Sequence, residues 1–139
     1  MSTVIRPKIS EKNKYYIDKH RYYELKHFCL QYKEWKKEYA SCNESLIFAS
    51  SFEATRHNNI PSDLTAKYAI KKAQCAGRIK MVEKAAMETD ECLYTYILKA
   101  VTEGLSYQYL KTKLCIPCGK DMYYDRYRRF FWILDNIRE

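Results

Sequence analysis

The chain has 139 residues, of which 47% are hydrophobic, and it carries a formal net charge of +8. This length favours one domain with a hydrophobic core of its own. No apolar run approaches the roughly 20 residues that span a bilayer, and the first 14 residues lack the apolar segment of a secretory signal. We therefore expect a cytoplasmic protein without a transmembrane segment, with its six cysteines reduced.

The basic residues gather towards the two ends of the chain. Residues 1–40 contain 10 Lys or Arg and 5 Asp or Glu, residues 41–104 contain 8 of each, and residues 105–139 contain 7 and 4. A basic surface attracts nucleic-acid phosphates or anionic membranes through long-range electrostatics. An excess of this size also suits an ordinary solvated surface, so charge alone does not identify a partner.

The N-terminal half is expected to contain a flexible basic arm, residues 1–17, followed by a helical segment and linker, residues 18–62. Apolar residues recur every three or four positions from Asp18 to about Ala40, which predicts an amphipathic helix. The nearly heptad spacing also permits a homo-oligomer that pairs through this N-terminal helix. A short helix and a linker are expected within residues 41–62. The apolar stripe consists of Tyr22, Leu25, Cys29, Tyr32, Trp35 and Tyr39.

Residues 63–139 are expected to form a long helix followed by a C-terminal helix-turn-helix. The long helix should run to about Thr89. Asp90 is a suitable N-cap for the next helix, and Gly104 is a suitable C-terminal stop. No segment alternates apolar and polar residues long enough to predict a strand. The predicted fold class is all-α.

The C-terminal stretch "GLSYQYLKTKLCIPCGKDMYYDRYRRFFWIL", residues 104–134, predicts two helices joined by a tight turn. The first helix spans about 105–114, Ile116 is a buried residue of the turn, and the second helix begins near Gly119. This is the sequence pattern of a helix-turn-helix. The predicted buried face of the second helix consists of Tyr123, Tyr127, Phe130, Leu134 and Ile137.

A different face of the second helix carries basic and aromatic residues. Lys120, Tyr124 and Arg128 follow one another at steps of four, and we expect them to be exposed. A recognition helix needs such donors for phosphates and base edges near its N-terminus. Asp125 is expected to pair with Arg128 or Arg129. The candidate DNA-contacting residues are Lys111, Lys113, Lys120, Tyr123, Tyr124, Arg126, Arg128 and Arg129.

The segments "GLSYQYLKTKLCIP" and "YYDRYRRFFWIL" resemble the helix-turn-helix of sigma-factor region 4. They resemble still more the C-terminal part of small phage regulators of the ArpU/RinA type. The segment "LTAKYAIKKAQCAGRIKMVEKA" of this chain also resembles the long upstream helix of those regulators. The resemblance implies a phage or prophage regulator of transcription, an activator of late genes that binds double-stranded DNA and meets RNA polymerase. Cys115 stands where the turn usually has glycine, and the turn is about two residues longer. The matching positions are Gly104, Leu105, Ser106, Tyr107, Leu110, Leu114 and Ile116.

The remaining motifs give little support to other functions. Cys115 and Cys118 form a Cys-x-x-Cys, but no second Cys or His pair is spaced to complete a zinc site. No phosphate-binding glycine loop, nucleophile elbow or paired carboxylate set is present. We therefore expect no metal, no cofactor and no enzyme activity. Two other functions remain open: a small-terminase-like subunit for phage DNA packaging, and a helical adaptor or inhibitor that binds protein.

Overall fold

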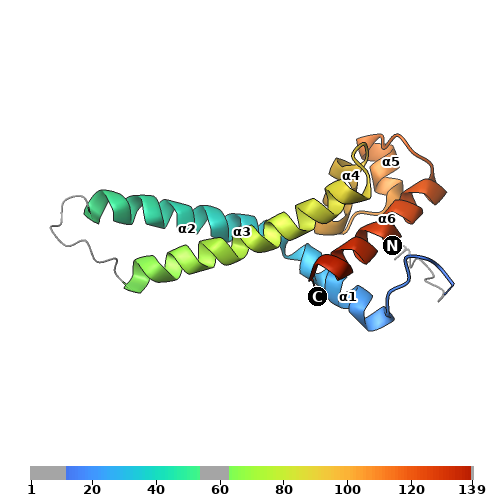
Figure 1. The fold of residues 1–139 in the computed structure, drawn as a ribbon. Helices are drawn as coiled ribbons and strands as arrows, with labels where there is room; N and C mark the ends of the chain where they lie inside the picture. Colours follow the sequence, from blue (N-terminus) through green and yellow to red (C-terminus); the bar gives the residue numbers. More distant parts are fainter. Residues whose placement is uncertain (1–11, 54–62, 139) are drawn as a thin grey trace. The chain divides into compact units, whose positions relative to one another are not determined.

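A computed structural model describes residues 12–53 and 63–138, and within these ranges it contains six α-helices and no strand (Figure 1). The predicted all-α class is confirmed. None of the helices in these ranges is both long enough and apolar enough to cross a membrane. The helices are α1 (Lys19–Leu30), α2 (Tyr32–Glu53), α3 (Asp63–Thr89), α4 (Tyr94–Glu103), α5 (Tyr107–Leu114) and α6 (Lys120–Arg138).

The chain divides into two compact units. Residues up to Gln31 and from Met81 onward form one, here called the bundle unit, and Tyr32–Lys80 form the other, the hairpin unit. The long helix α3 contributes its first part to the hairpin unit and its last part to the bundle unit. The first helix packs with α4 and α6, which begin more than 60 positions after it ends.

The predicted N-terminal helix was wrong in its extent. It stops at Leu30, and α2 begins at Tyr32 and continues to Glu53 instead of ending near Ala40. The helix reaches further because residues 41–53, which were expected to hold a short helix and a linker, contain no proline or glycine to end it. The remainder of that linker, and residues 1–11 of the expected arm, lie outside the described residues.

The core of the bundle unit is built on α6. This helix contacts α1 and α4, and α4 also contacts α1 and α5. Phe130 and Leu134 are fully buried, as predicted, and so is Leu110 on α5. The last part of α3 also contributes buried residues to this unit. The buried residues of this part are Val82, Ala85, Ala86 and Thr89.

The apolar stripe of α1 is covered within the bundle unit. Tyr22, Leu25 and Cys29 are buried, and α1 contacts α4 and α6. The Tyr22 hydroxyl lies 2.8 Å from that of Tyr127, and Arg21 pairs with Asp135 on α6 at 2.6 Å. These contacts cover the part of the predicted stripe that lies on α1, and the rest of the stripe lies on α2.

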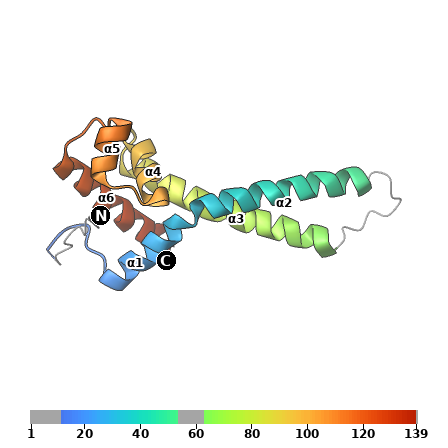
Figure 2. The same ribbon diagram turned by 180° about the vertical axis from the view of Figure 1, so that it is seen from behind.

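The hairpin unit consists of α2 and the first part of α3, which lie side by side in Figure 1 and Figure 2. Its contacts are antiparallel: Arg78 stacks on Trp35, whereas Lys72 bonds to Asn43 further along α2. Buried residues are few and include Cys42 and Cys75. Large apolar side chains are left exposed. They are Ile47, Phe48, Leu64 and Ile70.

We expect Phe130→Ala to lower the free energy of unfolding by about 3–5 kcal/mol, because it leaves a cavity at a fully buried site. Chemical denaturation followed by circular dichroism measures this loss. Trp132→Ala is the matched control, since Trp132 lies on the same helix but is 37% exposed. It should cost much less, and equal losses in the two variants would contradict the assigned core.

Candidate nucleic-acid interface

The candidate interface is the corner formed by α5, the connecting segment 115–119 and the start of α6. Ser106 caps α5, because its hydroxyl accepts a hydrogen bond from the backbone N–H of Tyr109 at 3.2 Å. Ahead of that cap, Gly104 ends α4 in the left-handed conformation with φ 68°, as predicted. The start of α5 is therefore set by two local signals in the sequence.

The connecting segment is held at both of its ends. The N–H of Ile116 donates to the carbonyl of Leu110 at 3.1 Å, and the Ile116 side chain is buried, as expected for the turn. The Tyr107 hydroxyl donates to the carbonyl of Cys118 at 2.8 Å. Cys115 takes the left-handed conformation with φ 53° that glycine normally supplies. These bonds keep Cys115 in a conformation that costs a non-glycine residue about 1–2 kcal/mol.

Three lysines of the predicted set are exposed around this corner. Lys111 and Lys113 lie in the last turn of α5, and Lys120 is the first residue of α6. Among the described residues none of the three forms an ion pair. Their positive charges are therefore available to an external anion.

Two tyrosines of the predicted set are not available. Tyr123 is 1% exposed and Tyr124 is 8% exposed, so the prediction that Tyr124 faces solvent was wrong. Both rings pack near that of Tyr107, with centroid distances of 5.4 and 6.3 Å. The buried arc of α6 is wider than one stripe because Tyr107, the first residue of α5, also packs against the first turns of α6. We leave both tyrosines out of the proposed interface.

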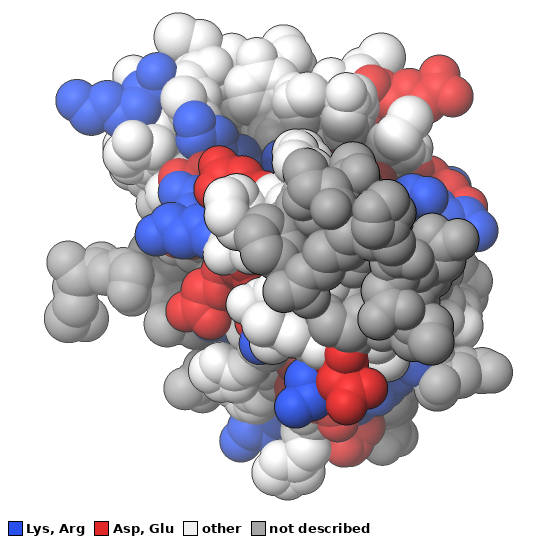
Figure 3. Space-filling view, turned by 90° about the vertical axis from the view of Figure 1, so that its left-hand side faces the viewer, with Lys and Arg blue, Asp and Glu red and all other residues white. Residues whose placement is uncertain are grey.

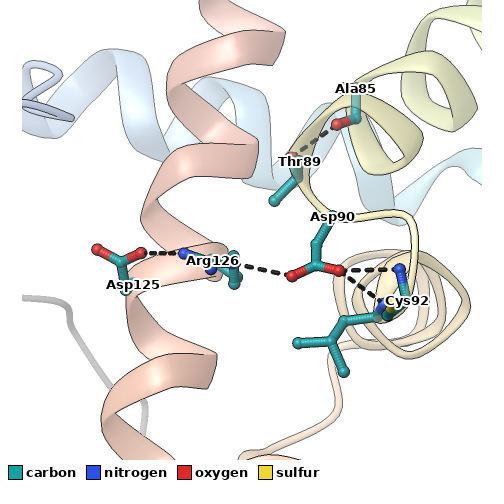
Figure 4. A network of polar contacts seen from close by, with 7 residues as sticks. Ala85, Thr89, Asp90, Cys92, Asp125 and Arg126 are labelled. Atoms are coloured by element: carbon teal, nitrogen blue, oxygen red, sulfur yellow. Dashed lines mark hydrogen bonds and ion pairs between the residues drawn. The ribbon is translucent and has the colours of Figure 1, made fainter.

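Arg126 belongs to an internal ion-pair network (Figure 4). Its Nε lies 2.9 Å from Asp90 and its Nη1 lies 2.6 Å from Asp125. The expected pairing of Asp125 with Arg128 or Arg129 was therefore wrong. Asp90, after the end of α3, thus joins α6 to the turn that precedes α4. The charge of Arg126 is already neutralised within the bundle unit.

Asp90 also fixes the turn itself. Its carboxylate accepts the backbone N–H of Cys92 at 2.8 Å and that of Leu93 at 3.2 Å, and α4 begins only at Tyr94. Burial acts to raise the pKa of Asp90, but the hydrogen bonds from Arg126 and these two N–H groups outweigh it and lower the pKa. Asp90 was expected only to cap the next helix, but it also forms an ion pair with Arg126 on α6.

The last two arginines of the set differ in their surroundings. Both are partly exposed. The Nε of Arg128 is buried without a hydrogen-bond partner in the described part of the chain, whereas Arg129 forms no ion pair there. Arg129 therefore joins the three lysines as an available positive charge.

Some tyrosine hydroxyls of the bundle unit have hydrogen-bond partners, and one buried hydroxyl does not. Those of Tyr22 and Tyr127 bond to each other, and that of Tyr107 bonds to the backbone. Burial raises the pKa of Tyr127 well above its usual value, which keeps this hydroxyl protonated. The hydroxyl of Tyr124 is buried and has no partner among the described residues.

The sequence alone did not reveal two features of this region, the pairing of Asp90 with Arg126 and the unpaired Tyr124 hydroxyl. Both depend on residues far apart in the chain. Comparison with known proteins found no similar one: no protein-family model, no curated protein and no solved structure matches this chain.

We expect Asp90→Asn to lower the free energy of unfolding by about 1–3 kcal/mol near neutral pH, because it removes a charged partner of Arg126. The pKa of Asp90 is lowered in the folded protein, so this stabilisation is present above the unfolded pKa of about 3.9 and is lost as the pH falls below it. Denaturation of both proteins over a pH series measures the difference. A gap that stays constant below about pH 4 would contradict the network.

We expect Tyr124→Phe and Tyr127→Phe to change stability in different directions. Removing the unpaired Tyr124 hydroxyl should leave stability unchanged or raise it, because an unsatisfied buried group costs about 1–3 kcal/mol. Removing the Tyr127 hydroxyl leaves that of Tyr22 without a partner and should lower stability by about 1–3 kcal/mol. Denaturation of each variant beside the wild type measures the two changes. A destabilised Tyr124→Phe protein would show that the Tyr124 hydroxyl has a partner in the wild type.

Proposed function

We propose that the protein binds double-stranded DNA through the corner of α5 and α6. The observation that carries the proposal is the set of exposed lysines, Lys111, Lys113 and Lys120, which flank the connecting segment and form no ion pair among the described residues. Phosphate contacts from such lysines supply most of the affinity of a DNA-binding protein, through release of counterions. Arg129 adds a fourth available charge.

The proposed mechanism places the start of α6 against the DNA backbone. Free N–H groups at a helix N-terminus, together with the helix dipole, favour a phosphate. Asp121 and Met122 are both exposed in the first turn of α6, and the negative charge of the Asp121 carboxylate repels phosphate. We therefore assign phosphate contacts to the lysines, and propose that Lys120 lies nearest the groove.

On the face shown in Figure 3, Lys and Arg side chains are interspersed with Asp and Glu, with no patch of one sign among the described residues visible there. Mixed charges of this kind suit a solvated surface and not a polyanion. A DNA site is more strongly favoured where cations lack acidic partners.

The resemblance to phage regulators extends the proposal to a role at promoters. In that role the protein would be a cytoplasmic transcription regulator, with RNA polymerase as its second partner. The alternative role in DNA packaging uses the same DNA-binding corner but requires a large ring of subunits. Size-exclusion chromatography with light scattering separates these roles, because only the packaging role predicts a large oligomer.

A second candidate function, protein binding by the hairpin unit, is favoured by a specific observation. Phe48 is 74% exposed, and Ile47, Leu64 and Ile70 are each more than half exposed. Exposed apolar residues mark a protein interface where they form a contiguous patch. The adaptor alternative would use this unit, and it predicts that the protein binds DNA weakly or not at all.

The test of DNA binding is a series of titrations of duplex DNA at several salt concentrations. Replacing both Lys111 and Lys113 with Ala should weaken binding and reduce the slope of log K against log salt by about two, and Lys120→Ala should reduce it by about one. Lys37→Ala is the matched control, an exposed lysine of the hairpin unit. It should leave the slope unchanged.

Two results would contradict the proposal. One is the absence of salt-dependent binding to any duplex by the wild-type protein. The other is binding that survives unchanged when Lys111, Lys113, Lys120 and Arg129 are all replaced with Ala. Loss of binding in the Lys37→Ala control would move the interface to the hairpin unit.

A further inference from the structure

The first part of α3 has an outer face, on the side of the helix opposite α2. Its inner side is defined by two contacts with α2. The Cys75 thiol donates a hydrogen bond to Glu38, and the Lys72 ammonium donates one to the side-chain oxygen of Asn43. Each residue turns an α-helix by about 100°, so the outer face is half a turn away from Cys75. Six exposed residues lie there: Asp63, Ala66, Ile70, Ala73, Gly77 and Lys80.

This outer face has the spacing and the shape of a helix-packing surface. Its residues follow one another at steps of 3, 4, 3, 4 and 3, which is the spacing of a helix that pairs along its length with another helix. Ile70, near its centre, is 59% exposed, and a side chain built at Gly77 would meet nothing within 4 Å. Small residues on both sides of Ile70 allow a second helix to approach closely.

The two ends of the outer face carry opposite charges, and these charges identify what covers it. Asp63 and Lys80 are 17 positions apart. That is about 25 Å along the helix, too far for the two to pair within one chain. Among the described residues neither forms an ion pair. A helix of complementary charge must therefore present a cation near Asp63 and an anion near Lys80, and α3 itself does so when its direction is reversed.

We propose that two copies of this chain pair through the outer face, with their α3 helices antiparallel about a twofold axis between residues 71 and 72. Asp63 then lies opposite Lys80 of the second copy, at both ends of the contact. The other positions match in the same register, Ala66 with Gly77 and Ile70 with Ala73, because each pair is centred on the same point. This is the self-complementary contact of a twofold dimer. Parallel pairing in register would place like charges together, which disfavours it.

The pairing does not depend on the DNA-binding proposal. All residues of the outer face belong to the hairpin unit, whereas the corner of α5 and α6 belongs to the bundle unit. Dimer formation is measured without DNA, so either proposal can fail while the other holds.

Sedimentation equilibrium of the full chain over a range of concentrations tests the dimer. Ala73→Glu should weaken it at least about 100-fold, because a carboxylate from each copy is then placed at the centre of the contact. Ala40→Glu is the matched control, the same substitution at an exposed alanine of α2. It should leave the dimer unchanged, and circular dichroism should show equal helix content in both variants. A wild-type chain that stays monomeric at every concentration, or equal losses in the two variants, would overturn the proposal.

A charge exchange tests the antiparallel register. Asp63→Lys alone or Lys80→Glu alone should weaken the dimer about 2- to 30-fold, because each places like charges opposite each other at both ends. A mixture of the two variants should pair about as well as the wild type. In the mixed dimer the new lysine lies opposite the new glutamate, and the unchanged Asp63 lies opposite the unchanged Lys80. The proposed register is wrong if the mixture pairs no better than either variant alone.

Discussion

The aromatic face of α6 holds the bundle unit together. Tyr123, Phe130 and Phe131 are all but inaccessible to solvent, and each is in ring contact with a neighbouring aromatic residue. Through Phe131 and Tyr127 the same face reaches Tyr22 on α1. Aromatic side chains bury large areas and pack at defined angles. The position of α1 depends on this packing.

This packing also limits what α6 can offer to a partner. Tyr123 and Tyr124 are both buried, so neither ring is available to a partner. Arg126 is held by Asp90 and Asp125, so its charge stabilises the bundle unit and is not free for DNA. Within α5 and α6 the three lysines, Lys111, Lys113 and Lys120, lie at the end of α5 and the start of α6, which is why the proposed interface is a corner and not the length of a helix.

The hairpin unit has few buried residues and depends more on polar contacts than the bundle unit does. Two helices bury few residues between them, and polar contacts such as those of Glu38 with Lys71 and Cys75 take up part of the seam. Short ion pairs at an exposed seam contribute little stability. The exposed apolar residues of this unit are accordingly the part of the molecule that would gain most from contact with another protein.

The sequence by itself determined the all-α class, the approximate extents of α3, α5 and α6, and the local signals at Gly104 and Ile116. These features depend on helical periodicity and on residues within four to six positions of each other. It did not determine which tyrosines of α6 are buried, because tyrosine suits both a core and a surface. Only the tertiary structure decided that, since Tyr107 of α5 packs against Tyr123 and Tyr124. It also decided the partner of Arg126, 36 positions away, and that of Tyr22, 105 positions away. Such pairings depend on how the helices pack, and no local pattern in the sequence specifies them.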